Sequence, residues 1–112
     1  MYNNLRLIYI TTNSKEEARS IGRALVEEKL AACVNIIDRM ESIYRWEGEI
    51  KEEQECLLIA KTHYSKVKQL TQRVDDMHSN DCPAVLSITL TEHEGNNNYA
   101  DWLLKEVRDD LV

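Results

Sequence analysis

Side chains that can bind metal ions stand at two places in the chain. Cys33 lies in the first third, and His78, Asp81 and Cys82 lie close together further on. Thiolate and imidazole groups are suitable ligands for copper and zinc. The spacing is less specific than a Cys-x-x-Cys pair, so it predicts a weak site for Cu²⁺ or another divalent cation. Cys33 also fits the alternative of a small buried apolar residue in a strand.

A group of glutamates is a second feature with an affinity for cations. Its members are Glu47, Glu49, Glu52, Glu53 and Glu55. Such a group attracts divalent ions weakly, but charges at a turn and a strand edge more often serve to prevent aggregation. We therefore interpret it as a solvated edge.

The sequence lacks the motifs on which common enzyme classes depend. It contains neither a glycine-rich phosphate loop nor a nucleophile elbow, and Gly22, Gly48 and Gly95 are scattered. His78 and Asp81 can form an acid–base pair, yet nothing near them in the sequence is typical of a nucleophile or a substrate clamp. We expect a protein that is not an enzyme.

Composition narrows the class of protein further. The 112 residues fit one domain, 1–112, and the net charge of −6 comes without a lysine or arginine cluster, which argues against nucleic-acid and membrane partners. No apolar run is long enough to span a bilayer, and the first residues do not have the pattern of a signal peptide. The three cysteines are widely spaced, which is not a disulfide framework, so we expect the cytoplasm.

Hydrophobic patterning predicts four strands and three helices. Ser14 and Glu17 form a capping box that starts the first helix, and Asn98 is the expected N-cap of the last one. The predicted strands are 5–12, 31–46 with a break at Asp38 and Arg39, 50–62, and 84–91; the predicted helices are 14–30, 65–78, and one from about 98 onward. This order is that of an α+β, ferredoxin-like split β-α-β sandwich with an extra C-terminal helix.

The second and third strands form the most unusual element of this prediction. Gly48 suits a tight turn between two arms of about 14 residues, which at about 3.3 Å per residue reach roughly 45 Å. A compact domain of this size is only roughly 35 Å across. The distal part carries Ile43, Tyr44 and Trp46, and an exposed apolar ribbon is marginal alone. We expect these side chains to form an oligomer interface, although capping of the chain's own core remains an alternative.

Several segments of the chain resemble the CutA divalent-cation tolerance family. They are Leu30–Asn35 (Leu-Ala-Ala-Cys-Val-Asn), Ser42–Gly48 (Ser-Ile-Tyr-Arg-Trp-Glu-Gly), Glu55–Thr62, and the pattern Gly95-Asn96 with Tyr99 and Trp102-Leu103. Two positions differ: Asp38-Arg39 replaces a Pro-Gly-type turn, and the loop 78–83 lacks the usual Pro-Tyr after its histidine. The resemblance implies a ferredoxin-like trimer and places Cys33 near a cleft between subunits.

Two functions follow from this resemblance. The first is a trimeric, non-enzymatic protein that binds copper or a similar divalent cation through Cys33 and His78, with Cys82 and Asp81 nearby. The second is a trimeric signalling protein similar to the PII proteins, in which Lys61, Arg45 and His78 hold a small anionic effector in clefts between subunits. A structural or adaptor trimer is a third alternative.

Overall fold

The computed structural model describes residues 3–108 of the chain. Within them the predicted order of strands and helices is confirmed. The elements are β1 (Leu5–Thr12), α1 (Lys15–Glu27), β2 (Cys33–Trp46), β3 (Glu49–His63), a 3₁₀ turn (Tyr64–Lys66), α2 (Val67–Met77), β4 (Val85–Thr89), a second 3₁₀ turn (Glu92–Glu94) and α3 (Asn97–Glu106).

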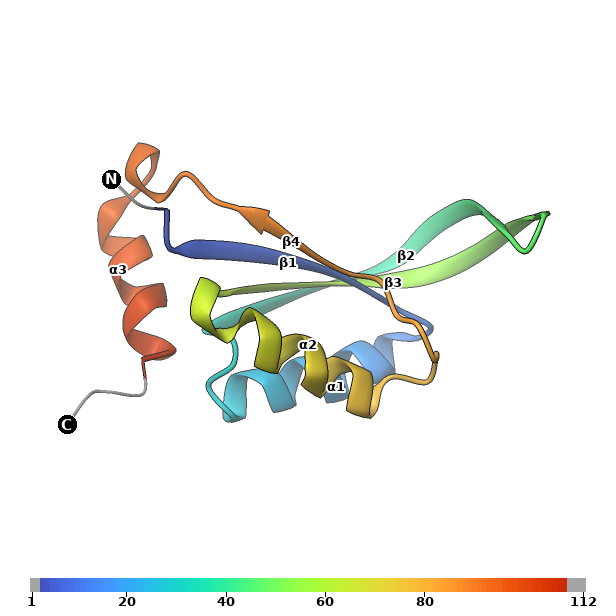
Figure 1. Cartoon of the computed structure of the whole chain (residues 1–112), viewed down its shortest axis with the longest axis horizontal. Helices are drawn as coiled ribbons and strands as arrows, with labels where there is room; N and C mark the ends of the chain where they lie inside the picture. Colours follow the sequence, from blue (N-terminus) through green and yellow to red (C-terminus); the bar gives the residue numbers. More distant parts are fainter. Residues whose placement is uncertain (1–2, 109–112) are drawn as a thin grey trace.

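The four strands form one antiparallel sheet in the order β2-β3-β1-β4. Helices α1 and α2 lie side by side on one face of this sheet, and α3 stands at one end of the molecule (Figure 1). This arrangement confirms the predicted α+β, ferredoxin-like fold.

The main core lies between the sheet and helices α1 and α2. Its fully buried side chains come from alternate positions of the strands and from one face of each helix, as period-two and period-3.6 patterns require; they include Ile8, Ile10, Leu58, Ile21, Leu25, Leu70 and Val74. Gly22 brings α1 close to the sheet, because a Cβ there would lie 3.1 Å from Val34 Cγ2. The helix layer is therefore pressed directly onto β2 and β3.

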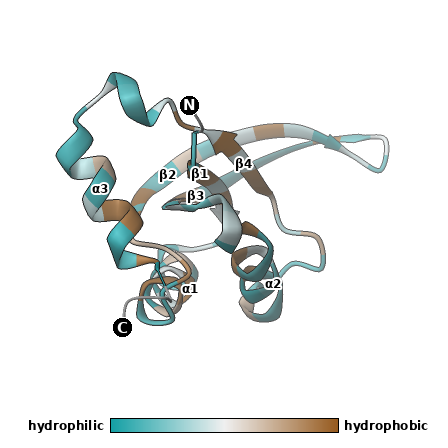
Figure 2. Ribbon diagram, turned by 60° about the vertical axis from the view of Figure 1, so that its left-hand side comes forward, coloured by the Kyte–Doolittle hydropathy of each residue, from teal (hydrophilic) through white to brown (hydrophobic). Residues whose placement is uncertain are grey.

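The opposite face of the sheet, called the open face below, is only partly covered. Helix α3 packs over its end near the start of β1, in a second cluster made by Leu5, Ala32, Ala100, Leu103 and Val107. Beyond this cluster, strand alternation and register place Ile37, Leu86 and Ile88 on the open face, each at least half exposed. Figure 2 shows the brown, apolar β4 next to this uncovered region.

The hairpin of β2 and β3 projects far beyond the helices (Figure 1). Its strands hold 14 and 15 residues, and the described molecule measures 49 × 27 × 22 Å. Both turn residues have positive φ, 49° for Glu47 and 82° for Gly48, as expected for a two-residue hairpin turn. The predicted long hairpin is thus confirmed.

The break predicted at Asp38 and Arg39 is a β-bulge inside β2 rather than a gap between two strands. Two residues of β2 stand there opposite Cys56, and Arg39 adopts a φ of 62°. After the bulge, even-numbered residues of β2 take the open face that odd-numbered residues held before it. Tyr44 and Trp46 therefore lie on the same side of the sheet as Ile37.

Several predicted boundaries were wrong, among them the end of the first helix, which stops at Glu27 rather than at residue 30. The helix predicted at 65–78 opens with a 3₁₀ turn, because the His63 ring accepts a hydrogen bond from Ser65 N–H and starts a tighter turn first. Helix α3 is capped by Asn96 rather than Asn98, since the Asn96 side chain accepts from two backbone N–H groups. Strand β4 is shorter than predicted, because it pairs with β1 over only five residues.

Candidate functional site

Cys33 lies on the open face at the start of β2. Its cross-strand neighbour is Lys61 of β3, and the half-buried thiol contacts the Val34 carbonyl oxygen at 3.8 Å. Cys33 also packs against the α3 cluster. Cys33 thus lies at the edge of a small apolar core, with Lys61 as its cross-strand neighbour.

Lys61 and two aromatic rings of α3 form a surface at this end of the molecule, called the Lys61 end below. Lys61 Nζ lies 3.1 Å from the Tyr99 hydroxyl and 5.3 Å from the centre of its ring. The Tyr99 and Trp102 rings lie 5.7 Å apart and tilted by 31°. The two residues are 45% and 44% exposed. Nearly half of each of these two residues therefore faces outward.

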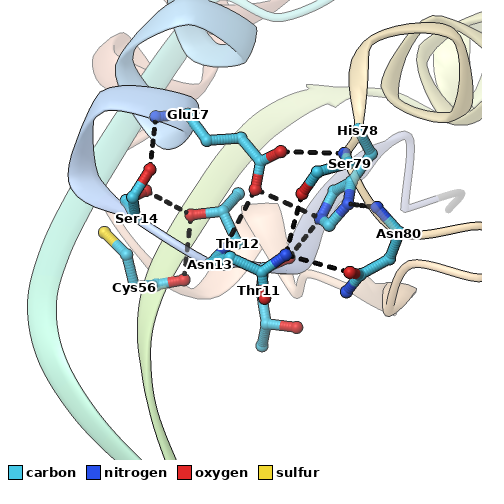
Figure 3. Close-up of polar contacts among 9 residues, drawn as sticks. All are labelled: Thr11, Thr12, Asn13, Ser14, Glu17, Cys56, His78, Ser79 and Asn80. Carbon is cyan, nitrogen blue, oxygen red and sulfur yellow. Dashed lines mark hydrogen bonds and ion pairs between the residues drawn. The ribbon is translucent and has the colours of Figure 1, made fainter.

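His78 is held between three segments of the chain (Figure 3). Its side chain is fully buried; Nδ1 accepts a hydrogen bond from the Asn80 backbone nitrogen at 3.0 Å, and Nε2 lies 2.8 Å from the Thr11 carbonyl oxygen. Nδ1 is therefore the acceptor and Nε2–H the donor of a neutral ring. Both nitrogens that bind metal are already engaged, so the ring would have to give up one hydrogen bond to bind an ion.

Glu17 joins the same network from the first turn of α1 (Figure 3). Its carboxylate accepts from the backbone N–H of Asn13 at 2.9 Å and of Ser79 at 2.8 Å, and it lies 4.0 Å from His78 Nε2. Partial burial opposes ionisation, but the hydrogen bonds from Asn13 and Ser79 outweigh it and lower the pKa of Glu17 below 4.5. The capping box thus fixes the loop after α2 as well as the helix.

The loop after α2 carries the remaining predicted ligands. Asn13 donates to Ser79 Oγ at 2.8 Å and to Asn80 Oδ1 at 2.9 Å, which ties this loop to the start of α1. Asp81 and Cys82 follow, and both are exposed. Sequence reasoning missed this network, although Glu17 in its capping box was a visible signal for part of it.

The predicted ligands do not meet within one chain. Cys33 lies level with Lys61 on β3, while His78 is bonded to Thr11, which lies level with Leu57. Four residues of strand separate these levels, about 13 Å. Over residues 3–108, no group of three or more His, Cys, Asp or Glu side chains is arranged to hold a metal ion. A site that combines Cys33 with the ligands of the loop after α2 therefore requires groups from more than one chain.

The predicted effector residues are also spread out. Arg45 pairs with Ile50 near the hairpin turn, eleven residues of β3 away from Lys61, about 36 Å. His78 lies between them, but its side chain is buried. These three residues likewise converge only if different copies of the chain come together.

A groove of about 970 Å³ runs between the distal hairpin and the loop after α2. It is lined by the rings of Tyr9, Tyr44 and Trp46, and by the carboxylates of Glu41, Glu53, Glu55 and Asp81. A hydrogen bond to Glu53, with smaller effects of desolvation and nearby carboxylates, raises the pKa of Tyr44 above 10.0. The predicted interface residues Ile43 and Trp46 are 62% and 53% exposed.

Comparison with protein families gives a match along most of the chain. Residues 6–106 match the model described as "CutA1 divalent ion tolerance protein". The chain belongs to the CutA1 family. This membership confirms the resemblance found in the sequence, and it agrees with the prediction of a tolerance protein that is not an enzyme.

Individual relatives support this assignment. The chain is similar to the divalent-cation tolerance protein CutA of Thermus thermophilus, with 46% identity over 97 residues, covering 87% of this chain and 92% of that protein. It is similar to the chloroplastic CutA protein of Arabidopsis thaliana, with 38% identity over 102 residues, covering 91% of this chain but only 55% of that protein.

Solved structures of CutA1 proteins have the same fold. The structure of the Thermus thermophilus protein superposes with a TM-score of 0.89 and 43% identity, covering 93% of this chain and 99% of that one. A structure described as a PII-like CutA protein from Nostoc sp. PCC 7120, in apo form, gives a TM-score of 0.84 and 29% identity, covering 92% of this chain and 97% of that one.

The described helices of this chain include none long and apolar enough to cross a membrane.

Proposed function

We propose that this CutA1-family protein is a homotrimer of single-domain chains that weakly binds copper or a similar divalent cation between its subunits. The observation that carries the proposal is the placement of the ligand-type side chains. Cys33 lies on the open face, and Asp81 and Cys82 lie in an exposed loop, at different levels of one sheet. Each group is available to an ion, but an ion held by both needs two chains.

Assembly is supported by the apolar surface that one chain leaves uncovered. Exposed apolar side chains lie on the open face and on both faces of the distal hairpin; among them are Ile37, Ile43, Trp46, Ile50, Leu86 and Ile88. Groups of exposed apolar side chains on one surface are typical of a protein–protein interface. A mass equal to one chain at micromolar concentration would remove the trimer and its sites together.

The ion site is proposed between Cys33 of one subunit and the loop from His78 to Cys82 of another. Cys33 supplies a thiolate, and Cys82 and Asp81 supply a thiolate and a carboxylate. His78 joins them only if its ring exchanges one of its two hydrogen bonds for the ion. This exchange costs binding energy, which is consistent with a weak site.

The test is calorimetric titration of the assembled protein with Zn²⁺, which does not oxidise thiols, and with Cu²⁺. We expect the Cys33→Ala and Cys82→Ala variants each to bind at least about tenfold more weakly than the wild type, because each loses a ligand. Cys56→Ala, which alters a buried thiol of the core, is the control and keeps the affinity. Equal binding by all four proteins contradicts the site.

A second function is favoured by the position of Lys61. Its ammonium group, on the Tyr99 ring, lies on the open face and suits a small anion of the kind a PII-like protein binds, and one relative's structure is described as PII-like. Thermal shift separates the two functions. Stabilisation by nucleotides or small carboxylates but not by metals favours the sensor. If neither class raises the melting temperature, a structural trimer is favoured.

The cytoplasm remains our proposed location. It is supported by three cysteines that are free in the part of the chain that the structure describes. Alkylation of the exposed Cys82 thiol in freshly lysed cells measures its redox state. A thiol that is largely oxidised before lysis contradicts a reducing compartment.

A further inference from the structure

Helix α3 packs on a small apolar cluster of its own and stands apart from α1 and α2 (Figure 1). This cluster, made by Leu5, Ala32, Ala100, Leu103 and Val107, is separate from the main core between the sheet and the other two helices. A helix of ten residues has little stability by itself in water, so α3 depends on this docking. Segments with few buried apolar contacts are the ones that open locally at low cost in free energy. Opening of α3 would leave the main core intact.

The Glu92 carboxylate fastens the segment before α3 to the start of β1. Glu92 is only 9% exposed, and its carboxylate accepts hydrogen bonds from the backbone N–H groups of Asn4 and Leu5, the latter at 3.1 Å. Strand β4 ends at Thr89, and Leu90 N–H still donates to the Leu5 carbonyl oxygen at 3.1 Å. The Glu92 side chain thus pairs backbone groups at the point where strand pairing stops. Hydrogen bonds from N–H groups to a carboxylate are stronger than those between neutral groups.

The side chains beneath α3 include a thiol and an ammonium group. Cys33 is half-buried and packs against the α3 cluster. Lys61, its cross-strand neighbour, donates a hydrogen bond to the Tyr99 hydroxyl at 3.1 Å. The position of α3 therefore determines how far solvent and solutes reach both groups.

We propose that residues 91–107 form a lid over Cys33 and Lys61, which swings on the chain after Leu90 and is fastened by the Glu92 carboxylate. The structure represents the closed lid. In the open state Glu92 leaves the backbone of β1, the Tyr99 hydroxyl leaves Lys61, and the Cys33 thiol becomes fully accessible. The motion occurs within one chain, so this inference goes beyond the proposed ion site and does not rest on the trimer.

The three cysteines provide a test within one protein. Cys33 is half-buried beside the lid, Cys56 is buried in the main core, and Cys82 is exposed. Alkylation of the native full chain with iodoacetamide, followed by mass spectrometry of the peptides, gives the labelling rate of each thiol. We expect Glu92→Gln, which keeps the size of the side chain but removes its charge, to raise the Cys33 rate by about tenfold. Cys56 should react far more slowly than Cys33 in both proteins.

Glu94→Gln is the matched control, because Glu94 lies in the same 3₁₀ turn but is exposed, and it should keep the wild-type Cys33 rate. Low urea concentrations separate local from global opening. They should accelerate Cys56 labelling steeply and Cys33 labelling only slightly, because opening the lid exposes little surface. Hydrogen exchange on the wild type is an independent measurement, in which the amides of α3 should exchange faster than those of β1.

Several results would overturn the lid. Equal Cys33 rates in Glu92→Gln and the wild type would show that Glu92 does not fasten it. Cys33 and Cys56 reacting at the same rate would show that only global unfolding exposes the thiol. A Cys33 rate that falls as the protein concentration rises would assign access to dissociation of subunits instead. Amides of α3 that exchange as slowly as those of β1 would exclude the opening itself.

Discussion

The His78 ring connects β1, the loop after α2 and, through Glu17, the first turn of α1. Hydrogen bonds at both of its nitrogens leave it no spare position for an ion in this conformation. Asp81 and Cys82 follow only a few residues later, and both are exposed to solvent. At the scale of single residues, therefore, neighbours in the sequence have very different freedom to act as ligands.

Glu17 allows a direct test of this network. We expect Glu17→Ala to lower the free energy of unfolding by about 1 kcal/mol, because two backbone N–H groups lose their acceptor. The pKa of Glu17 is lowered in the folded protein, so its contribution is complete above pH 4.5 and is lost as the pH falls through the folded value. Urea denaturation at pH 7 and at pH 3.5 measures both effects.

Glu16→Ala is the matched control, because Glu16 lies in the same helical turn but is exposed. Its effect should stay within about 0.5 kcal/mol at both pH values. Equal losses for the two variants at pH 7 would show that the Glu17 contacts add nothing to a general helix-end effect.

The lowered pKa of His63 predicts a second pH dependence of folding stability. Burial lowers the pKa of the ring below 6.5, with Arg6 and Lys66 acting in the same direction and Glu92 against it. Its contribution to stability is thus complete above pH 6.5 and declines as the pH falls toward the folded pKa. We expect His63→Asn, which keeps an acceptor for Ser65 N–H, to lose less stability than the wild type between pH 7.5 and pH 5.

The melting temperature across this pH range is the measurement, with His93→Asn as the control for removing a histidine elsewhere. His78 is present in all three proteins, so it does not affect the comparison. Identical pH profiles for His63→Asn and the wild type would exclude His63 as a source of the dependence.

At the scale of elements, the sequence predicted secondary structure best where one local residue pattern defines the strand or helix. The β-branched and aromatic run of β1 and the capping box of α1 predicted those elements closely. The 3₁₀ turn before α2 could not be predicted in the same way, because it depends on the His63 ring accepting a local hydrogen bond. The loop network around His78 depends on contacts between residues more than sixty positions apart, which no local pattern contains.

The hairpin turn gives a prediction at this scale. Gly48 has a φ of 82° with open space around its Cα, so an added Cβ costs backbone strain and meets no neighbour. We expect Gly48→Ala to lower the free energy of unfolding by about 1 kcal/mol. Gly95→Ala is the control, because Gly95 has equally open space but a φ of −110°, and it should be neutral. Equal effects would exclude strain as the cause.

At the scale of the whole molecule, the hairpin links the fold to the proposed assembly. A ribbon that extends beyond the helix layer has too little cover of its own, as the exposures of Ile43 and Ile50, 62% and 59%, show. The length of the two predicted strands was enough to predict the uncovered ribbon, because the arms are longer than a domain of this size can cover. It did not predict that α3 and the loop after α2 lie at opposite ends of the sheet, because that depends on contacts between distant parts of the chain.

If folding is coupled to the proposed assembly, the melting temperature should depend on protein concentration. If subunits bind only when folded, the melting temperature rises with protein concentration. We expect a clear increase over a hundredfold range for the wild type and a much smaller one for Trp46→Ala, whose side chain is 53% exposed in one chain. Differential scanning calorimetry measures both. A wild-type melting temperature independent of concentration would contradict the coupling.

The bulge at Asp38 and Arg39 affects the direction of the hairpin, whereas the strand pairing beyond it does not depend on the extra residue. Removing Arg39 would leave one residue opposite Cys56, so Met40 would still pair with Glu55, and Tyr44 and Trp46 would keep their partners and their side of the sheet. What would change is the trajectory of the ribbon, because a bulge bends its strand and increases the local twist. A single-residue deletion is therefore milder for pairing than a deletion of two, which would turn the ribbon over. The extra residue thus steers the distal arms, and a chain shortened there would fold normally while pointing its aromatic tip in another direction.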